Sequence, residues 1–343
     1  MKAVRYHGDG ELRVEQIPDP TPGPDDVLLA PLAVGVCGTD NHIIAGHFVS
    51  RPPVVLGHEV AAEVIALGRD VRGLEVGQLI TVEPHLYCGR CVPCQTGRQH
   101  LCPDRAAPGV HLDGGMAERL VVPATLAYPV PDGVPVEHAA MTEPIACCVH
   151  GMDRLAPMSG MPLAVFGCGP AGAIMIALAR LAGAHPIIAL DPQPARRQLA
   201  LRVGADVALD PTEEGLTERM ADLTDGQGVA AAIDAVGSAR VLEQAIGLSA
   251  RGGRILVFGV ADAGERAAIS PNDVYLRELT ILGTALNPYT HRRAVGLLQR
   301  LPLDQLCTAS YDLDSVPDAL DAQRLGKADK VFIHPQSHNG GHP

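Results

Sequence analysis

The chain has 343 residues, a net charge of −12 and a hydrophobic share of 47%, which favours two compact domains over one. Its basic residues form no run longer than a pair and it contains no Trp, so nucleic-acid binding is not expected. No apolar stretch approaches the roughly 18 residues that a membrane span requires. We therefore expect no membrane partner and a small-molecule substrate.

The cysteine content indicates a reducing environment. The chain contains nine cysteines, an odd number, and four of them are spaced as metal ligands. Such usage fits a reducing compartment better than a disulfide framework. The first residues alternate apolar and charged side chains and lack the apolar core of a secretory signal. We expect a cytoplasmic protein.

The first half of the chain is predicted to be rich in β-strands. Gly and Pro turns separate short apolar runs at 27–36, 54–56, 59–67 and 78–82. This pattern predicts a β-rich, partly barrel-like domain.

Four cysteines then follow within one short stretch. They are Cys88, Cys91, Cys94 and Cys102, in Cys-x2-Cys-x2-Cys-x7-Cys spacing. That spacing predicts a tetrahedral zinc site. Because four thiolates leave no coordination position open, this zinc is predicted to be structural, and a catalytic metal must bind elsewhere.

The second half changes to strand-length apolar runs that alternate with alanine-rich helices. The predicted strands lie at 163–166, 187–190, 207–209, 230–235, 254–260 and 280–286. Six such strands predict a doubly wound parallel sheet of the α/β class. A helix at 292–301 and a strand at 330–334 are predicted to return to the first domain. The predicted domains are therefore 1–149 with 287–343, and 150–286.

A glycine-rich loop follows the first strand of that sheet. Gly167, Gly169 and Gly172 form a Gly-x-Gly-x-x-Gly pattern, with Pro170 and Ala171 in its second gap. The first glycine permits a tight turn, the second lets the backbone approach a pyrophosphate, and the third allows close helix packing. The helix amino terminus adds partial positive charge. This context favours a dinucleotide site over a glycine-rich turn without a ligand.

The next strand ends at an acidic residue that bears on the choice of dinucleotide. Asp191 can accept hydrogen bonds from the ribose hydroxyls and repel a 2′-phosphate. Arg196 and Arg197 lie a few residues further on, and a guanidinium there could instead bind that phosphate. We predict NAD as the cofactor, with NADP as the less favoured alternative.

A second, scattered group of residues has the composition of a catalytic zinc site. Cys37, His58 and Glu143 offer a thiolate, an imidazole and a carboxylate, and three protein ligands leave one position open for chemistry. Each also has an ordinary structural explanation: a small buried thiol, a core histidine and a helix-start carboxylate. The spacing of these residues alone does not decide between a catalytic zinc site and three separate structural roles.

Together these motifs resemble the zinc-dependent medium-chain dehydrogenases over nearly the whole chain, up to about Ile333. The resemblance rests on Cys-Gly-Thr-Asp-x-His at 37–42, Gly-His-Glu at 57–59, the four-cysteine run, Glu-Pro-x-Ala at 143–146 and the glycine loop. It implies a GroES-like catalytic domain and a Rossmann domain. Gly38 and Glu143 resemble the branch of sorbitol, threitol, butanediol and threonine dehydrogenases, because simple alcohol dehydrogenases usually carry a third cysteine ligand.

The resemblance implies a ligand set for the catalytic zinc. Cys37 and His58 would bind it, and Glu59 and Glu143 would compete for the third position. Asp40 would orient the ring of His58, as partners of metal-bound histidines do, although a turn or helix-cap aspartate is the alternative.

It also implies a proton path and cofactor contacts. Thr39 would hydrogen-bond the substrate oxygen, and His42 would pass the proton onward, although His42 could also be a surface histidine. Val260 and Leu286, at the ends of the fifth and sixth predicted strands, would contact the cofactor, Leu286 through its backbone. Lys330 would lie near the pyrophosphate, unless it is an exposed loop lysine.

The expected function is hydride transfer between a secondary alcohol or its ketone and NAD, with one catalytic and one structural zinc per chain. Polyols, sugars or cyclitols are the expected substrates. The alternatives are threonine 3-dehydrogenase-like oxidation of an amino alcohol, or a nucleotide-binding protein that kept the fold without catalysis. The resemblance favours a homotetramer, with a dimer second.

Overall fold

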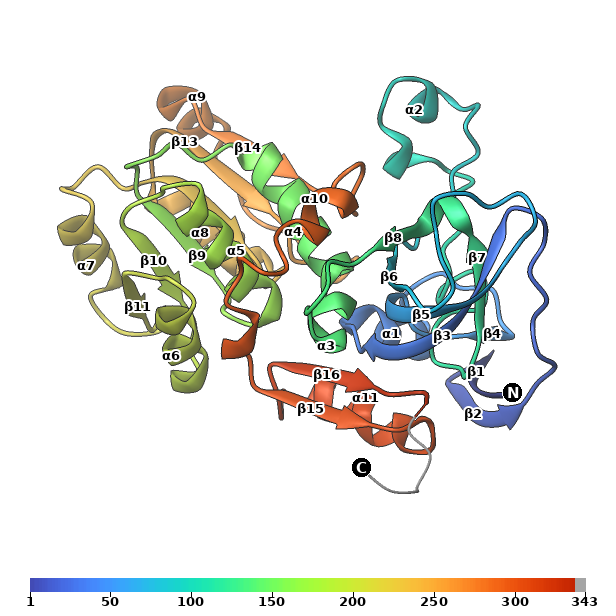
Figure 1. Cartoon of the computed structure of the whole chain (residues 1–343). Coiled ribbons are helices and arrows are strands. Elements are labelled where there is room, and N and C mark those ends of the chain that lie inside the picture. The colour runs from blue at the N-terminus through green and yellow to red at the C-terminus, as the bar shows by residue number, and fades with distance from the viewer. Residues whose placement is uncertain (337–343) are drawn as a thin grey trace. The chain divides into compact units, whose positions relative to one another are not determined.

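A computed structural model of the chain describes residues 1–336 (Figure 1), and it divides into two compact units. Unit 1 contains Met1–Pro144, Pro288–Arg300 and Cys307–Pro343, and unit 2 contains Ile145–Asn287 and Leu301–Leu306. The unit boundaries therefore fall within five residues of those predicted, except that 301–306 belongs to unit 2. Apolar side chains of that segment line a small pocket with Ala173, Ile174 and Ala177 of unit 2, which explains its placement.

Unit 1 is built on β-sheets, as expected. Its strands are β1 (Lys2–Gly8), β2 (Glu11–Gln16), β3 (Asp26–Gly35), β4 (Val54–Val55), β5 (Glu59–Leu67), β6 (Leu79–Val82), β7 (Leu120–Pro123), β8 (Ala127–Pro129), β15 (Thr308–Tyr311) and β16 (Lys330–Ile333). A three-stranded sheet has the order β2-β1-β4, and a seven-stranded sheet has the order β15-β16-β3-β5-β6-β8 with β7 also paired to β3. One apolar core joins residues from both sheets, including Val4, Leu29 and Ile80.

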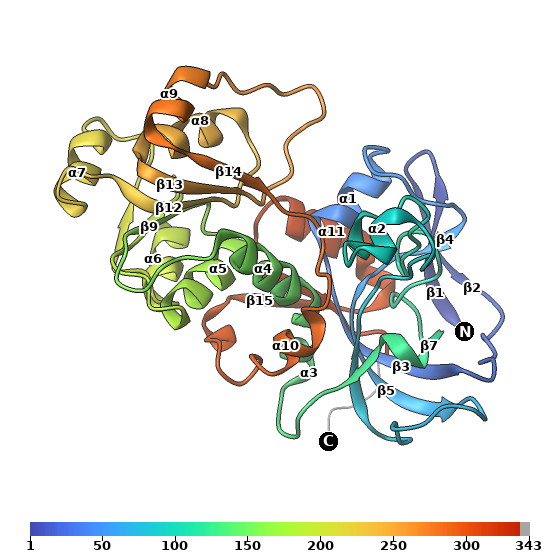
Figure 2. The same cartoon turned by 90° about the horizontal axis from the view of Figure 1, so that it is seen from above.

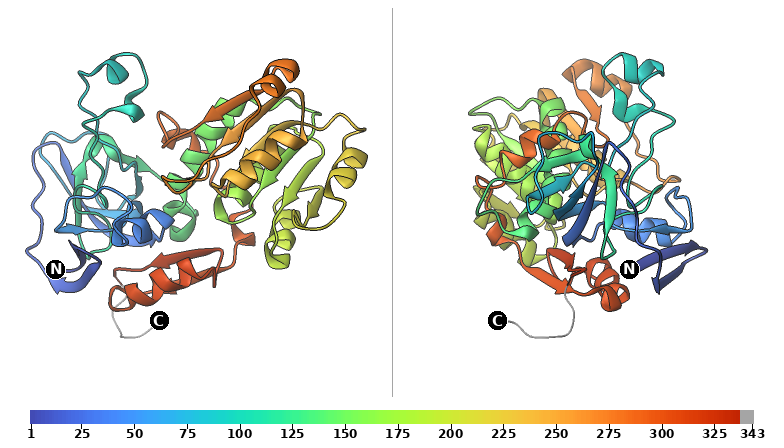
Figure 3. Two further views of the ribbon diagram at one scale, coloured as in Figure 1. Left: turned by 180° about the vertical axis from the view of Figure 1, so that it is seen from behind. Right: turned by 45° about the vertical axis from the view of Figure 1, so that its right-hand side comes forward.

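Short helices connect the strands of unit 1. They are α1 (Gly38–Ile44), α2 (Val92–Gln95), α3 (Val136–Ala140), α10 (His291–Val295) and α11 (Val316–Arg324), with 3-10 turns η1 (Gln99–Leu101), η2 (Ala124–Leu126) and η4 (Leu313–Ser315). The helix predicted at 292–301 is thus confined to the five residues of α10. Figure 3 shows α11 beside β15 and β16, the returning strands at the edge of the larger sheet.

Unit 2 is a Rossmann-type domain and confirms the predicted fold class. Its elements are α4 (Thr142–Leu155), β9 (Leu163–Phe166), α5 (Pro170–Leu181), β10 (Ile187–Leu190), α6 (Pro194–Arg202), β11 (Val207–Leu209), α7 (Leu216–Leu223), β12 (Val229–Asp234), α8 (Ala239–Leu248), β13 (Ser249–Val257), α9 (Pro271–Arg277), β14 (Thr280–Gly283) and η3 (Leu303–Gln305). The six strands are all parallel, in the order β11-β10-β9-β12-β13-β14. Helices α8 and α9 lie on one face of the sheet and α5 and α6 on the other (Figure 2).

Two predicted strands in unit 2 end three residues earlier than expected. β13 ends at Val257 rather than residue 260, and β14 ends at Gly283 rather than residue 286. Val260 therefore lies in a loop with 83% of its surface exposed. Leu286 also follows its strand, and its φ of +59° is a left-handed conformation that a strand cannot accommodate.

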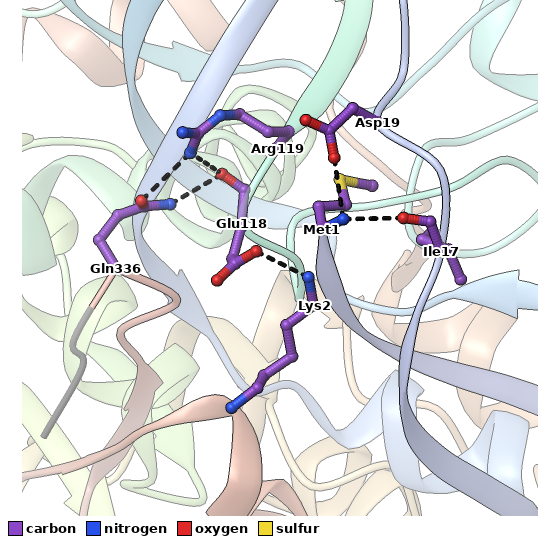
Figure 4. Close-up of polar contacts among 7 residues, drawn as sticks. All are labelled: Met1, Lys2, Ile17, Asp19, Glu118, Arg119 and Gln336. Atoms are coloured by element: carbon purple, nitrogen blue, oxygen red, sulfur yellow. Dashed lines mark hydrogen bonds and ion pairs between the residues drawn. The ribbon is translucent and has the colours of Figure 1, made fainter.

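Polar contacts tie both ends of the described chain into unit 1 (Figure 4). The amino group of Met1 pairs with Asp19 at 2.8 Å. The backbone N–H of Lys2 donates to the carboxylate of Glu118, and the backbone carbonyl of Glu118 accepts a 2.8 Å hydrogen bond from Gln336. The segment around Glu118 thus links the first strand to the last described residue.

Candidate functional site

The first candidate site lies at one end of the β3–β5 pair in unit 1. Gly35, the last residue of β3, is paired in register with Glu59, the first residue of the antiparallel strand β5. Cys37 follows β3 and His58 precedes β5, so this pairing brings residues that are distant in sequence to the same place. The potential ligand atoms of Cys37, His58 and Glu59 all lie within 4.8 Å of one another.

Asp40 lies behind His58 and is completely buried. One of its carboxylate oxygens is 3.5 Å from Nδ1 of His58, and the other accepts a 2.9 Å hydrogen bond from the backbone N–H of Cys37 at the start of α1. Asp40 therefore caps the helix, as its alternative interpretation predicts, and also faces the imidazole; that it orients the ring stays a prediction. With Nδ1 turned to Asp40, Nε2 is the nitrogen left for a metal.

The electrostatics of this set fit a cation. Burial alone would lower the pKa of His58, but the neighbouring Asp40 and Cys37 raise it well above its usual range. The surroundings of the ring therefore favour positive charge. A thiolate, an imidazole and a carboxylate within mutual reach are the donors that zinc accepts in catalytic sites, so the residues present fit the metal.

Lys330 also lies at this site, where it is not the exposed loop lysine that the sequence left as an alternative. It lies in strand β16 and is buried. Its ammonium forms an ion pair with Glu59 and donates to the carbonyl of Val36 at 3.2 Å. Both contacts place Lys330 beside the candidate metal ligands, and its proximity to the pyrophosphate stays a prediction.

A glycine provides the space for this ion pair. A Cβ atom placed on Gly35 would collide with the Glu59 carboxylate and would lie 3.0 Å from Cε of Lys330. Sequence reasoning missed the pairing of Glu59 with Lys330 because nothing local marks either partner. The available signal was a lysine within an otherwise apolar terminal strand.

Glu143 lies outside the group of three ligand residues. It is buried in the first turn of α4. The alternative predicted from the sequence, a carboxylate at the start of a helix, therefore also describes it. Its charge, together with those of Glu59 and Cys37, raises the pKa of Lys330 against the opposing effect of burial. Glu143 is thus electrostatically coupled to the site, and Glu59 is the carboxylate that lies within 4.8 Å of the Cys37 and His58 ligand atoms.

Two further residues of α1 extend from the ligand set. The hydroxyl oxygen of Thr39 lies 3.6 Å from the sulfur of Cys37, so Thr39 lies next to the predicted metal position. His42 is three residues further along the same helix and is exposed. Residues three apart share a helix face, which places the exposed imidazole on the side of Thr39.

The four cysteines form a separate group in unit 1. The sulfur atoms of Cys88, Cys91, Cys94 and Cys102 lie within 4.8 Å of one another, and all nine cysteines of the chain are free thiols. Hydrogen bonds from the backbone at Arg90 and Cys91 lower the pKa of Cys88 to about 6. Four sulfurs at this separation fit a tetrahedral zinc with no open position.

The glycine loop of unit 2 has the geometry that the sequence predicts. Gly167 adopts a φ of +86° at the end of β9, and a Cβ on Gly172 would collide with the carbonyl of Gly167. Gly169 is the N-cap of helix α5, and Pro170 and Ala171 are the first two residues of the helix. The loop therefore turns tightly and leaves the helix amino terminus close to its backbone, as an anion site requires.

Asp191 directly follows β10 and contacts the backbone of this loop. Its carboxylate accepts 2.8 Å hydrogen bonds from the backbone N–H groups of Cys168 and Gln193. The guanidinium of Arg197 donates hydrogen bonds to the backbone carbonyl of Asp191 and to the carboxylate of Asp210. Arg196 is held more loosely, since its guanidinium is 3.9 Å from the Asp191 carboxylate.

The comparisons with known proteins agree with these observations. Residues 23–132 match the family model of the alcohol dehydrogenase GroES-like domain, and residues 170–300 match that of the zinc-binding dehydrogenases. The chain therefore belongs to the zinc-binding dehydrogenase family. It is an oxidoreductase that acts on alcohol CH–OH groups and depends on zinc and NAD(P).

Individual relatives cover almost the whole chain. An L-threonine 3-dehydrogenase of Pyrococcus horikoshii is 36% identical over 326 residues, which is 92% of both chains. A sorbitol dehydrogenase of Bacillus subtilis is 32% identical over 98% of this chain and 97% of its own. A zinc-binding dehydrogenase of Sinorhizobium meliloti, solved with NADP bound, superposes with a TM-score of 0.94 at 38% identity, covering 97% of this chain and 99% of its own. Among residues 1–336, no helix is long and apolar enough to cross a membrane.

Proposed function

We propose that Cys37, His58 and Glu59 bind the catalytic zinc, and that the four-cysteine group binds a structural zinc. The observation that carries the first assignment is the convergence of a thiolate, an imidazole and a carboxylate within 4.8 Å, with Asp40 behind the imidazole. We assign Glu143 to the surroundings of the metal rather than to direct binding. The bound zinc supplies Lewis-acid chemistry, which lowers the pKa of an alcohol and polarises a ketone.

The chain's own residues would then manage the substrate and its proton. Asp40 fixes the ring of His58, so that the ligand does not rotate. The hydroxyl of Thr39, beside the Cys37 sulfur, would accept a hydrogen bond from the substrate hydroxyl. His42 on the exposed side of the helix would carry the proton to water.

For the cofactor, we propose that Gly167, Gly169 and Gly172 contact the pyrophosphate of NAD and that Asp191 accepts from the adenosine ribose. The engaged carboxylate of Asp191 retains free lone pairs for this purpose. The Sinorhizobium meliloti relative was solved with NADP, so Arg196 remains the residue through which a 2′-phosphate could bind. Val260 and Leu286 stay predicted cofactor contacts from unit 2 loops.

The proposed substrates are polyols, sugars or cyclitols with a secondary hydroxyl. The second candidate is threonine 3-dehydrogenase-like oxidation, which the Pyrococcus horikoshii relative favours. Initial rates with NAD on sorbitol, threitol, butanediol, inositol and L-threonine at equal concentration would separate them. If only L-threonine reduces NAD, the polyol proposal is wrong.

A catalytic role also requires metal. We expect two zinc ions per chain after mild purification, measured by elemental analysis. Fewer than two would favour a nucleotide-binding protein without catalysis. We further propose a homotetramer, for which the open edge of β14 and the exposed Tyr275 and Leu276 nearby give support. A cytoplasmic location also stays a prediction.

A further inference from the structure

His42 does not stand alone on the surface of unit 1. A second exposed histidine, His47, lies beside it, and the two ring centroids are 6.2 Å apart with an angle of 43° between their planes. We propose that His42 and His47 form a second, inhibitory metal site for a borderline divalent transition ion such as Ni²⁺ or Zn²⁺. Neither histidine belongs to the two groups of potential zinc ligands described above.

The backbone holds the two histidines in position. The carbonyl of His42 accepts hydrogen bonds from the N–H groups of His47, at 2.8 Å, and of Phe48, at 3.2 Å. Gly46 makes the intervening reversal with a φ of +75°, and its N–H bonds to the carbonyl of Ile43. The chain therefore turns back on the end of α1, and the separation of the two Cα atoms is fixed rather than left to a loose loop.

The spacing suits two imidazoles that share one ion. Metal–nitrogen bonds of about 2 Å, with bond angles near 90–110°, would place two ring centroids roughly 5 Å apart. The observed 6.2 Å needs only a small side-chain rotation, and exposed rotamers change readily. Neutral imidazole nitrogens prefer zinc, nickel and copper over calcium or magnesium, and water would complete the coordination.

The consequence for catalysis rests on the proposed role of His42. An ion bound to its ring nitrogen removes the proton acceptor and adds positive charge at the exit of the relay. The filled site would therefore slow turnover while leaving both zinc ions in place. Its occupancy would depend on free metal in solution, which makes it an inhibitory site rather than a cofactor site.

The test uses the zinc-loaded full chain and Ni²⁺ as the probe. Calorimetry and steady-state rates are measured for the wild type, His47→Asn and His42→Asn. We expect both single variants to lose about tenfold or more in Ni²⁺ affinity at this site. We expect His47→Asn to keep the uninhibited rate, with a half-inhibitory Ni²⁺ concentration raised by a similar factor.

The tail histidines require a matched control, because His338 and His342 could also bind nickel. These residues lie outside the described part of the chain. The double variant His338→Asn/His342→Asn should keep the inhibition of the wild type. Equal Ni²⁺ affinity in the wild type and both single variants, or inhibition lost in the tail variant instead, would overturn the proposal.

The binding measurement also separates this proposal from the proposed function. A protein without dehydrogenase activity would still show whether His42 and His47 bind Ni²⁺ together. Conversely, an active enzyme whose inhibition is unchanged in His47→Asn would retain the dehydrogenase assignment and reject the second metal site.

Discussion

The buried ion pair between Lys330 and Glu59 gives the sharpest test of the candidate metal site. Its two side chains are 7% and 1% exposed. Replacing Lys330 with Met keeps the length of the side chain but leaves the Glu59 carboxylate buried without its cation. Breaking such a pair by removing one partner costs roughly 3–5 kcal/mol.

An exposed ion pair in the same unit serves as the matched control. Lys2 pairs with Asp314, with side chains that are 29% and 62% exposed. Pairs of this kind contribute little to stability because solvent screens them. Lys2→Met should therefore change the free energy of unfolding by about a quarter of the Lys330→Met effect or less.

The loss of unfolding free energy in Lys330→Met should depend on whether zinc is bound. In protein stripped with a chelator, Lys330→Met should show its full penalty in denaturant unfolding. In zinc-loaded protein the penalty should shrink, because Glu59 then faces a second cation. Adding Glu59→Gln should restore much of the stability of the stripped variant, since the uncompensated charge is gone.

Two results would refute this reasoning. A stripped Lys330→Met protein as stable as Lys2→Met would show that the buried pair contributes little. Equal penalties with and without zinc would show that Glu59 is not next to the metal, and would return the third ligand position to Glu143.

Three further predictions use other parts of the structure. Thr39→Val should lower kcat by at least about a hundredfold with unchanged thermal stability, if the hydroxyl begins the proton path; a normal kcat would reject that role. Cys91→Ser should lower the zinc content by one ion per chain and reduce stability or assembly before it alters the chemical step, which elemental analysis and single-turnover rates together check. Burial lowers the pKa of His291 to about 3, below its value of about 6.5 in the unfolded chain, so the stability it contributes is lost as pH falls from 6.5 toward 3. His291→Gln should flatten this part of the stability curve between pH 4 and 7, and an unchanged slope would assign the acid loss to other groups.

The features predicted well from the sequence are those determined locally. The glycine loop, the strand before it and the acid after the next strand are set by residues within one supersecondary unit. Strands 163–166, 187–190 and 207–209 match the structure residue for residue. The same holds for the four-cysteine group, whose members lie within one short stretch of sequence.

The features missed depend on contacts between distant segments. The sequence predicts Val260 and Leu286 at strand ends because their apolar runs continue past the last paired residue, but pairing between β13 and β14 stops at Val257 and Gly283. Periodicity cannot show where a neighbour ends. The ion pair of Lys330 cannot be predicted from the sequence for the same reason, since its partner Glu59 is brought to it only through pairing of β3 with both β5 and β16.

The charge of the assembled site explains why a buried lysine belongs in it. A Cys37 thiolate, Asp40, Glu59 and the coupled Glu143 would place four negative charges around the end of the β3–β5 pair, three of them on buried residues. Lys330 offsets one of them, and a single divalent ion offsets two more. Without the lysine a further negative charge would lose its counter-ion, which is costly in a buried site. The absence of a side chain at Gly35, which gives Glu59 and Lys330 room to meet, is therefore as much a requirement of the metal site as the ligands themselves.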